Sequence, residues 1–428
     1  MKILYGVCGE GMGHATRAAV VIEHLRARGH QVLVVASGQA LRVLRSESPS
    51  RAAASEFPPS VTAALDGAFN ERAVYGRAGA AGEERGGSLQ GESLRVIPIV
   101  GLGMRCQDGA LDLRGTIEEN AQRLPRMLME NAPVWAEAER FAPDAAITDY
   151  DSFVWFFATA HRVPIVSIDN AQVLPRCMHR RALFREHEGG MRALEAFTVA
   201  KAPSAQHYIV TTFFYPPVKP HLQSATTLVP PILRSDVLKR LDGTSGRQGL
   251  SESHLGEHVL VYKTGSLDDA TFVRPLAQVP EQRFVVYGLR DRGGVPANVD
   301  ARPFDTGTFL ADLASSRGVI GNAGMSLLGE ALAFGKPIYG IPVRGQYEQV
   351  LNACYLEQLG YGTTSETLEP ERLRAFLAHA DAYKTAITRV PQHDGNMRLF
   401  YTLDALFPGT TSVAVHGRPS EARARRQS

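Results

Sequence analysis

Residues 317–341 hold two short apolar segments on either side of a helical pattern, an order typical of strand–turn–helix–strand units in open α/β sheets. The first apolar segment, residues 317–320, runs into the turn Gly321 to Gly324, and a periodic apolar helix pattern starts at about Met325. A glycine turn at the start of a helix leaves backbone N–H groups free, and these groups and the helix dipole attract phosphate. The segment therefore predicts a phosphate site at the edge of a parallel sheet.

Two further features extend this phosphate site into a pocket. Glu330 lies farther along the helix, where its carboxylate can reach a ribose hydroxyl pair. Polar residues 345–349 follow the second apolar segment, residues 338–341. Ligands of open α/β sheets bind beyond the carboxyl ends of the strands. We therefore expect one pocket that takes a phosphate, a ribose and a group rich in hydroxyls.

The N-terminus contains a similar unit. A predicted strand at residues 1–7 is followed by a glycine-rich loop, a helix over 18–28 and a strand over 32–36. The loop glycines alternate, so the Gly-x-Gly-x-x-Gly spacing of dinucleotide-binding loops is missing, and no acidic residue ends the second strand. The pattern favours a doubly wound α/β unit and argues against NAD or FAD binding.

The C-terminal block resembles the nucleotide-sugar signature of GT-B glycosyltransferases, a broad group that includes the UDP-glucuronosyltransferases and the macrolide and plant glucosyltransferases. The residues that match this signature are Gly324, Ser326, Glu330, Glu348-Gln349 and Asn352-Ala353. Asn322 stands where the signature has His, and it carries less charge. The chain is most similar to a less-studied bacterial and archaeal set of glycosyltransferases related to the UDP-glucuronosyltransferase and teichoic-acid-type families.

The resemblance implies the GT-B plan, in which two Rossmann-like doubly wound α/β domains face each other across a cleft. It implies a hexosyltransferase that moves a sugar from a nucleoside-diphosphate sugar, UDP-linked by family habit, to an acceptor hydroxyl with inversion. The implied ligands of the donor nucleotide are Lys263, Thr264, Gly265, Phe304, Asn322, Gly324, Met325, Ser326 and Glu330. The implied ligands of the donor sugar are Gln346, Glu348 and Gln349.

The N-terminal loop resembles the acceptor-facing loop of GT-B enzymes, whose His is the general base. His14 is suited to this role because the ordinary pKa of His lies close to working pH. Asp149 matches the partner carboxylate, with Asp151 in reserve, and the acceptor side is expected to include Gly11, Gly13, Arg17 and Asp151. The alternative is that His14 only caps the helix or faces solvent, and that Arg17 is an exposed helix residue.

No metal site is expected. Asp149-x-Asp151 resembles the metal motif of another glycosyltransferase class, but its position at a strand end favours the role of His partner. In GT-B enzymes the helix dipole and backbone N–H groups take the place of the cation. The nucleotide sugar is then a co-substrate, and no separate cofactor is implied.

Length and patterning predict two domains. A chain of 428 residues exceeds a single typical domain. We expect an acceptor domain at residues 1–230, a polar linker at 231–257 and a donor domain at 258–408, whose last helix could pack back on the first domain. Residues 50–90 are expected to form a long loop or to be disordered, and the basic tail 409–428 is expected to be disordered.

Composition narrows the partners. A net charge of +2 gives no indication of nucleic acid binding, and no run of 18 apolar residues predicts a spanning helix. Four dispersed cysteines and a charged second residue predict a cytoplasmic protein, with peripheral contact to the inner membrane face left open. The acceptor could be a small molecule, a lipid or a glycan. Two other functions stay open, a nucleotide-sugar 2-epimerase of the same fold and a degenerate nucleotide-sugar-binding protein.

Overall fold

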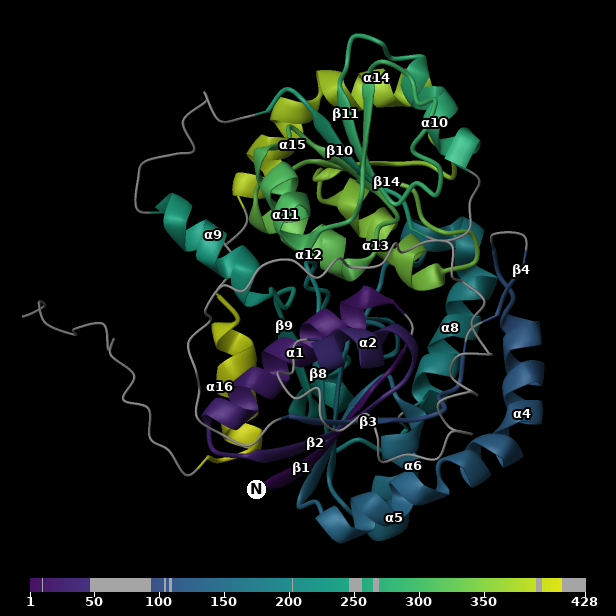
Figure 1. The fold of residues 1–428 in the computed structure, drawn as a ribbon, viewed down its shortest axis with the longest axis vertical. Coiled ribbons are helices and arrows are strands. Elements are labelled where there is room, and N and C mark those ends of the chain that lie inside the picture. The colour runs from purple at the N-terminus through teal and green to yellow at the C-terminus, as the bar shows by residue number, and fades with distance from the viewer. Residues whose placement is uncertain are drawn as a thin grey trace, which may run out of the picture.

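The chain folds into two α/β halves, each built on a parallel sheet, and this confirms the predicted fold class. The computed structural model describes residues 1–9, 11–46, 94–103, 105–107, 110–201, 203–245, 256–264, 269–389 and 395–409. Figure 1 shows the N-terminal half below and the C-terminal half above, with helices on both faces of each sheet. The segment 50–90, residue Gly265 and all of the tail after Gly409 lie outside the described residues.

The first sheet has seven parallel strands in the order β3-β2-β1-β6-β7-β8-β9. Its strands are β1 (Lys2–Val7), β2 (Gln31–Ala36), β3 (Arg95–Pro98), β6 (Ala145–Asp149), β7 (Ile165–Asp169), β8 (His207–Thr211) and β9 (Thr226–Val229). The central strands are nearly continuous runs of buried residues, because helices cover both faces of the sheet. The carboxyl ends of β1 and β6 lie side by side, with Val7 paired to Asp149.

Helices and short elements complete this half. They are α1 (Met12–Ala27), α2 (Gly38–Ser46), α4 (Leu113–Glu130), α5 (Ala132–Phe141), α6 (Ser152–His161), α7 (Val173–Arg176), α8 (Glu188–Lys201), 3-10 turns at Arg181–His187 and Pro220–Ala225, and the antiparallel pair β4 (Cys106–Gln107) and β5 (Ala110–Leu111). Two details differ from expectation. The helix α1 starts at Met12 rather than at Ala18, so Gly13 and His14 lie in its first turn. The sequence predicts a helical stretch over 117–141 that is interrupted near Pro125 and Pro133, but α4 continues through Pro125, and Pro133 lies in the first turn of α5, where Pro is tolerated.

The second sheet has six parallel strands in the order β12-β11-β10-β13-β14-β15. Its strands are β10 (Val259–Tyr262), β11 (Phe284–Tyr287), β12 (Val299–Arg302), β13 (Val319–Gly321), β14 (Ile338–Gly340) and β15 (Gly362–Thr364). Its helices are α10 (Asp269–Ala277), α11 (Thr306–Ser315), α12 (Met325–Ala333), α13 (Tyr347–Gln358), α14 (Pro370–Ala378) and α15 (Ala380–Thr388). The helix α12 follows β13, which pairs with β10, and α13 follows β14 on the other side of β13, so both helices start at the carboxyl edge of the sheet.

The two halves are joined at several points. The expected polar linker contains a helix, α9 (Ser235–Ser245), because an amphipathic stretch follows Arg234. The last helix, α16 (Met397–Leu406), lies beside α1 on the N-terminal half (Figure 1). There the ring of His24 stacks on Phe400 at 4.2 Å, and Asp404 accepts hydrogen bonds from His24 and Arg28. The chain therefore crosses between the halves twice.

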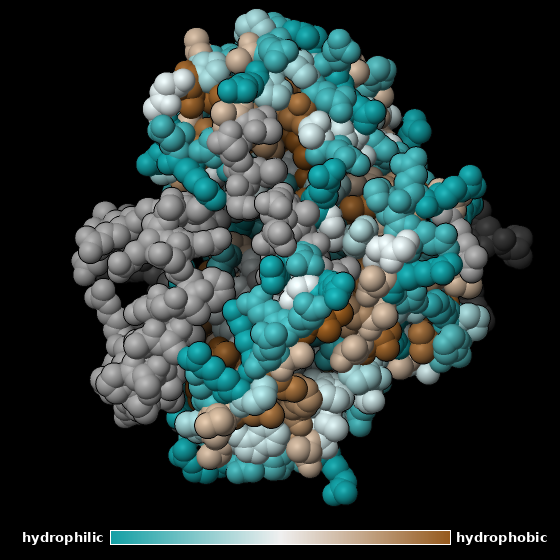
Figure 2. All heavy atoms as spheres, turned by 90° about the vertical axis from the view of Figure 1, so that its right-hand side faces the viewer, coloured by the Kyte–Doolittle hydropathy of each residue, from teal (hydrophilic) through white to brown (hydrophobic). Residues whose placement is uncertain are grey.

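An apolar core is continuous across the junction of the halves. The ring of Phe214, from the N-terminal half, stacks on Tyr355 of α13 with 3.8 Å between centroids and 9° between planes. Burial of two large aromatic rings at the junction stabilises the contact through both area and stacking. Hydrophobic side chains are scattered over the coloured part of the face in Figure 2, where hydrophilic side chains predominate. Each helix of the described residues is too short or too polar to cross a lipid bilayer.

Candidate active site

His14 and Asp149 form a hydrogen-bonded pair at the carboxyl edge of the first sheet. His14 lies in the first turn of α1, and Asp149 ends β6, the strand next to β1. The ring Nδ1 lies 2.7 Å from Asp149 Oδ1. The carboxylate is fully buried, whereas 18% of the His14 side chain is exposed. One ring nitrogen is thus held by a carboxylate while the ring keeps access to solvent.

Arg17 holds the other side of the same carboxylate. Its Nε donates to Asp149 Oδ2 at 2.8 Å, and its Nη2 donates to Asp149 Oδ1. Burial alone would raise the pKa of Asp149, but the positive charge of Arg17 and the contact with His14 hold that pKa below its ordinary value. Arg17 was expected to face the acceptor. It is instead only 5% exposed, because its guanidinium is needed to neutralise a buried carboxylate.

Asp151 also differs from its predicted place on the acceptor side. Its Oδ1 accepts a hydrogen bond from the backbone N–H of Val154 at 3.0 Å, so it caps α6. It is buried, and burial raises its pKa to about 6. A helix cap needs a short polar side chain that accepts a backbone hydrogen bond. Asp151 has this role in α6, and its carboxylate is buried rather than turned toward an acceptor.

Tyr150, which sequence reasoning missed, forms the turn between these two aspartates. Its φ is 58°, a left-handed conformation that is strained for a residue with a β-carbon. Its ring lies nearly parallel to that of His14, 19° apart in plane with 6.2 Å between centroids. Lys201 of α8 donates to the Tyr150 carbonyl at 3.3 Å and lies 4.8 Å from the ring centroid. The sequence carries no signal for a left-handed tyrosine.

The predicted phosphate loop lies at the corresponding edge of the second sheet. Gly324 precedes α12, and no side chain of the described residues caps this helix. Met325 is buried as the first residue of α12, and Ser326 follows it. Ala323 has a φ of 57°, and Asn352 of α13 donates to its carbonyl at 3.0 Å. The backbone N–H groups of the first turn of α12 therefore have no side-chain acceptor in the described part of the chain.

Asn322 holds strand ends together. Its Oδ1 accepts from Thr264 Oγ1 at 2.6 Å and from the Thr264 backbone N–H at 3.2 Å. Its Nδ2 donates to the Ile341 carbonyl at 3.1 Å. Contact with a diphosphate was expected from this side chain. Within the described part of the chain, one N–H of the amide has no acceptor, and the other amide atoms link the ends of β10, β13 and β14.

The other predicted nucleotide residues come from the neighbouring strands. Lys263 is buried, with its Nζ 2.8 Å from Asp269 Oδ1, an ion pair rather than a well-aligned hydrogen bond. Phe304 is half-buried in an aromatic cluster with Tyr262 at 5.8 Å and Phe309 at 5.3 Å. Thr264, which follows Lys263, is hydrogen-bonded to Asn322 of the phosphate loop, and Phe304 packs on Tyr262 and Tyr287 at the ends of β10 and β11.

Glu330 does not present a free carboxylate. Its two oxygens accept from Arg234 Nε at 2.7 Å and Nη2 at 2.8 Å, a bidentate pair between α12 and the linker. Glu330 was expected to bind ribose, but Arg234 already occupies both of its oxygens. A bidentate guanidinium pair stabilises a buried carboxylate, so a ribose would compete with Arg234. Arg234 was not singled out in the sequence, and no motif marks it.

The three predicted sugar residues lie at the start of α13. Gln349 Oε1 accepts from the Val343 backbone N–H at 2.8 Å, which closes the loop after β14. Gln346 Oε1 is buried without a hydrogen-bond partner among the described residues. Burial raises the pKa of Tyr150, and the charge of Glu348 raises it further, so Glu348 lies within electrostatic reach of the N-terminal half.

The predicted acceptor and donor loops meet across the junction. A β-carbon added to Gly13 would lie 2.6 Å from Ser326 Oγ, so α1 and α12 approach each other at their N-terminal ends. Gly190 of α8 likewise touches the ring of Tyr347 at the start of α13. Gly11 lies directly before α1, on the same side. The structure therefore brings the His14–Asp149 pair and the start of α12 to one place.

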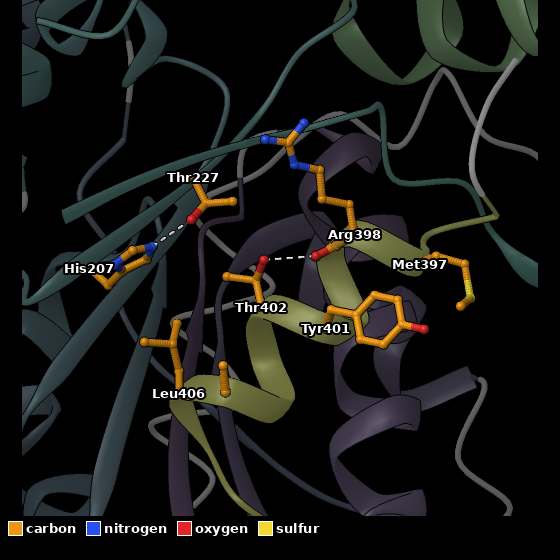
Figure 3. A pocket seen from close by; sticks show the side chains of 8 residues that line it. His207, Thr227, Met397, Arg398, Tyr401, Thr402 and Leu406 are labelled. Atoms are coloured by element: carbon orange, nitrogen blue, oxygen red, sulfur yellow. Dashed lines mark hydrogen bonds between the residues drawn. The ribbon is translucent and has the colours of Figure 1, made fainter. Parts of the chain in front are cut away.

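A separate groove lies elsewhere on the N-terminal half. It has a volume of about 500 Å³ and runs between α16 and the strands β8 and β9, of which β9 is the edge of the sheet (Figure 3). His207 and Thr227 share a 2.8 Å hydrogen bond on one side, and Met397 and Tyr401 of α16 line the other. None of the residues that line it belongs to the predicted site. Among the described residues, no three His, Cys, Asp or Glu side chains are grouped to hold a metal ion.

The chain is similar to several glycosyltransferases. It is 22% identical over 425 residues to an uncharacterised glycosyltransferase of Methanosarcina acetivorans, covering 93% of this chain and 95% of the relative. It is 43% identical over 68 residues to an uncharacterised glycosyltransferase of Methanosarcina mazei, covering 16% and 18% of the two chains.

Solved structures show the same fold at low sequence identity. The glycotransferase of kitacinnamycin matches with a TM-score of 0.56 at 17% identity, over 95% of this chain and 99% of its own. UGT2 of Phytolacca americana, complexed with UDP-2fluoro-glucose and pterostilbene, matches with a TM-score of 0.54 at 14% identity, over 91% and 93%. The calicheamicin glycosyltransferase CalG4 matches with a TM-score of 0.51 at 17% identity, over 91% and 92%. These likenesses establish the GT-B fold.

The family assignment rests on the sequence itself. The family model described as glycosyl transferase family 1 matches residues 1–52 and 79–380. This span includes both sheets and every predicted site residue. It supports glycosyl transfer and gives no support to the epimerase or the degenerate binder. The chain belongs to glycosyl transferase family 1 and is a glycosyltransferase.

Proposed function

We propose that this enzyme transfers a sugar from a UDP-linked donor to an acceptor hydroxyl, with His14 as the general base. The observation that carries the proposal is the approach of Gly13 to Ser326, because it sets the His14–Asp149 pair opposite the N-terminal end of α12. A base and a diphosphate site on facing loops are what a displacement at an anomeric carbon requires.

The diphosphate is proposed to bind at the start of α12. Backbone N–H groups of Met325 and Ser326 point out of an uncapped helix end, and the helix dipole adds a partial positive charge there. These groups would stabilise the charge that develops on the leaving diphosphate. The uridine assignment is supported by UGT2 of Phytolacca americana, whose structure contains UDP-2fluoro-glucose. Glu330 is proposed to bind the ribose, and the ribose hydroxyls would then have to replace one of the two hydrogen bonds that Glu330 accepts from Arg234.

The proposed reaction is a single displacement. Asp149 holds the Nδ1 side of the ring, so Nε2 is left to take the proton of the acceptor hydroxyl. The acceptor oxygen forms a bond to the anomeric carbon as the bond from that carbon to the diphosphate oxygen breaks. The electron pair leaves with the diphosphate, and the configuration at the carbon is inverted. Gln346, Glu348 and Gln349 are proposed to hold the hydroxyls of the transferred sugar, because they lie beyond β14 and within reach of the N-terminal half.

Calorimetric titration of the full chain with UDP, TDP and UMP tests the donor assignment. We expect both diphosphates to bind and UMP to bind more weakly, because the phosphate nearest the sugar would sit at the start of α12. At 100 times its dissociation constant, a diphosphate should stabilise the folded chain by about 2.7 kcal/mol. Absence of heat and of any thermal shift with both diphosphates would contradict the donor site.

A further inference from the structure

Arg17 is a buried arginine whose guanidinium contacts both residues that the reaction is proposed to use, His14 and Asp149. Its fork takes both oxygens of Asp149, and its Nη2 lies 3.0 Å from His14 Nδ1. Arg17 follows His14 by three residues on α1, a spacing that places two side chains on the same face of a helix. At 5% exposure it is too buried to serve as a surface contact for an acceptor.

The hydrogen-bond roles around His14 follow from the charge of Asp149. The positive charge of Arg17 holds the pKa of this carboxyl below its ordinary value despite its burial, so the carboxylate is ionised and only accepts. Nδ1 lies 2.7 Å from Asp149 Oδ1 and must then donate to it. The Arg17 guanidinium also only donates. Its Nη2 and His14 Nδ1 lie close to each other because both donate to the same oxygen, Asp149 Oδ1. This arrangement selects the ring tautomer with its proton on Nδ1.

The charge balance of the cluster points the same way. Arg17 and Asp149 cancel each other when the His14 ring is neutral, whereas a protonated ring would add an unbalanced positive charge beside a buried guanidinium. Among the described residues, Asp151 interacts electrostatically with Asp149, and Lys201 lies over the Tyr150 ring. The Tyr150 ring faces His14, and Asp169 of β7 and Tyr5 of β1 interact electrostatically with Arg17.

We propose that Arg17 is a positioning residue that fixes the Asp149 carboxylate and keeps the His14 ring neutral, with its Nε2 lone pair toward the cleft. This inference rests on the proposed role of His14 as base. It assigns to the His-x-x-Arg spacing of α1 a function in the reaction rather than in folding alone. The alternative geometry, in which Arg17 donates to a bare Nδ1 and Nε2 carries the proton, would leave no base facing the acceptor.

The ring tautomer of the unaltered protein provides the first test. Nitrogen chemical shifts of the His14 ring, assigned by comparison with His14→Gln, should show the proton on Nδ1 above the midpoint of its titration. A proton on Nε2 would overturn the proposal. This reading needs no substrate, so it is independent of whether sugar transfer is found.

Substitutions separate the charge of Arg17 from its shape. Arg17→Gln keeps a donor to Asp149 but removes the charge, and the His14 titration midpoint and the acid limb of kcat/KM should both move up by about one pH unit or more. Arg17→Lys keeps the charge but loses the fork, so its acid limb should stay near that of the unaltered enzyme while kcat falls. Arg26→Gln, an exposed position on the same helix, is the matched control.

The outcomes can be told apart. An unmoved midpoint in a folded Arg17→Gln variant would make Arg17 a structural residue only. A moved midpoint in a protein that transfers no sugar would uphold the positioning role and reject the proposed function. If Arg17→Gln does not fold, the tautomer of the unaltered protein and the Arg17→Lys profile still decide the proposal.

Discussion

The backbone of Gly13 in α1 faces the hydroxyl of Ser326 in α12, with space for a hydrogen but not for a methyl group. A β-carbon at Gly13 would lie 2.6 Å from Ser326 Oγ but 3.7 Å from Ser326 Cβ. The close approach therefore depends on the hydroxyl of one residue and the missing side chain of the other. It brings the two halves together at Gly13, the residue before His14, and at the first turn of α12.

Gly13→Ala should therefore lower kcat/KM by about tenfold or more, and Ser326→Ala should restore much of that loss in the double variant. The reason is that alanine at 326 removes the one atom of the described residues that the new methyl group would overlap. Steady-state kinetics of the two single variants and the double variant form the test. Losses that simply add would show that the two residues do not constrain each other.

His14→Ala should reduce kcat by about 10² to 10⁴, because proton removal from the acceptor would lose its base. Donor affinity should stay nearly unchanged, since His14 belongs to the opposite half from the start of α12. Turnover and calorimetry with UDP are measured on the same variant. A large loss of UDP affinity would instead place His14 on the phosphates.

Gln349→Ala should weaken binding of the nucleotide sugar by about 0.5–1.5 kcal/mol and leave binding of bare UDP almost unchanged. Gln349 closes the loop after β14 through Val343, and its amide nitrogen has no recorded partner among the described residues. The same titration with Gln358→Ala, at the exposed far end of α13, is the control. Equal losses for UDP-sugar and UDP would remove Gln349 from the sugar site.

Two adjacent glycines of α8 should respond in opposite directions to alanine. A β-carbon at Gly189 meets nothing within 4 Å, so Gly189→Ala should stabilise the helix by about 0.5–1 kcal/mol. A β-carbon at Gly190 would overlap the ring of Tyr347, so Gly190→Ala should lower the thermal midpoint and disturb the start of α13. Similar midpoints for both variants would show that Tyr347 moves aside at little cost.

Asp169→Asn should change stability in a pH-dependent way. Burial raises the pKa of Asp169 to about 6 from an ordinary 3.8, so the folded state binds its proton more tightly than the unfolded state does. The stabilisation from that proton is complete below pH 4 and is lost as pH rises through 6. The variant should therefore exceed the unaltered protein in unfolding free energy by at most about 3 kcal/mol at pH 8, with no advantage at pH 4. Chemical denaturation at both pH values measures this, and a pH-independent difference would contradict it.

The sequence predicts the fold well because its periodic features are local. Apolar runs followed by glycine turns and amphipathic helices locate β1, α1, β13 and α12 without tertiary information. Helix ends are less certain, because the start of α1 depends on the loop before it. The helix α9 was missed because its polar composition resembles a linker.

The partners of the site residues were harder to predict for a different reason. The closeness of His14 and Asp149 was expected from a family pattern. The hydrogen-bond partners of Arg17, Asp151 and Glu330 depend instead on which carboxylates are buried in the fold. A buried carboxylate needs a donor, and the donor can come from any part of the chain. Arg234 lies 96 positions from Glu330, too far for any local pattern to link them.

The left-handed turns at Tyr150 and Ala323 occupy matching places in the two halves. Each comes just after the strand that lies beside the first strand of its sheet, β6 next to β1 and β13 next to β10. Each is preceded by a polar residue, Asp149 or Asn322, whose side chain links neighbouring elements. The same left-handed bend thus occurs once in each half, and the residue before it differs. In the N-terminal half that residue is an ionised carboxylate bonded to a histidine, and in the C-terminal half it is an uncharged amide beside the phosphate loop. A change between carboxylate and amide at this position would therefore change the charge of the site in that half while the backbone bend stays the same.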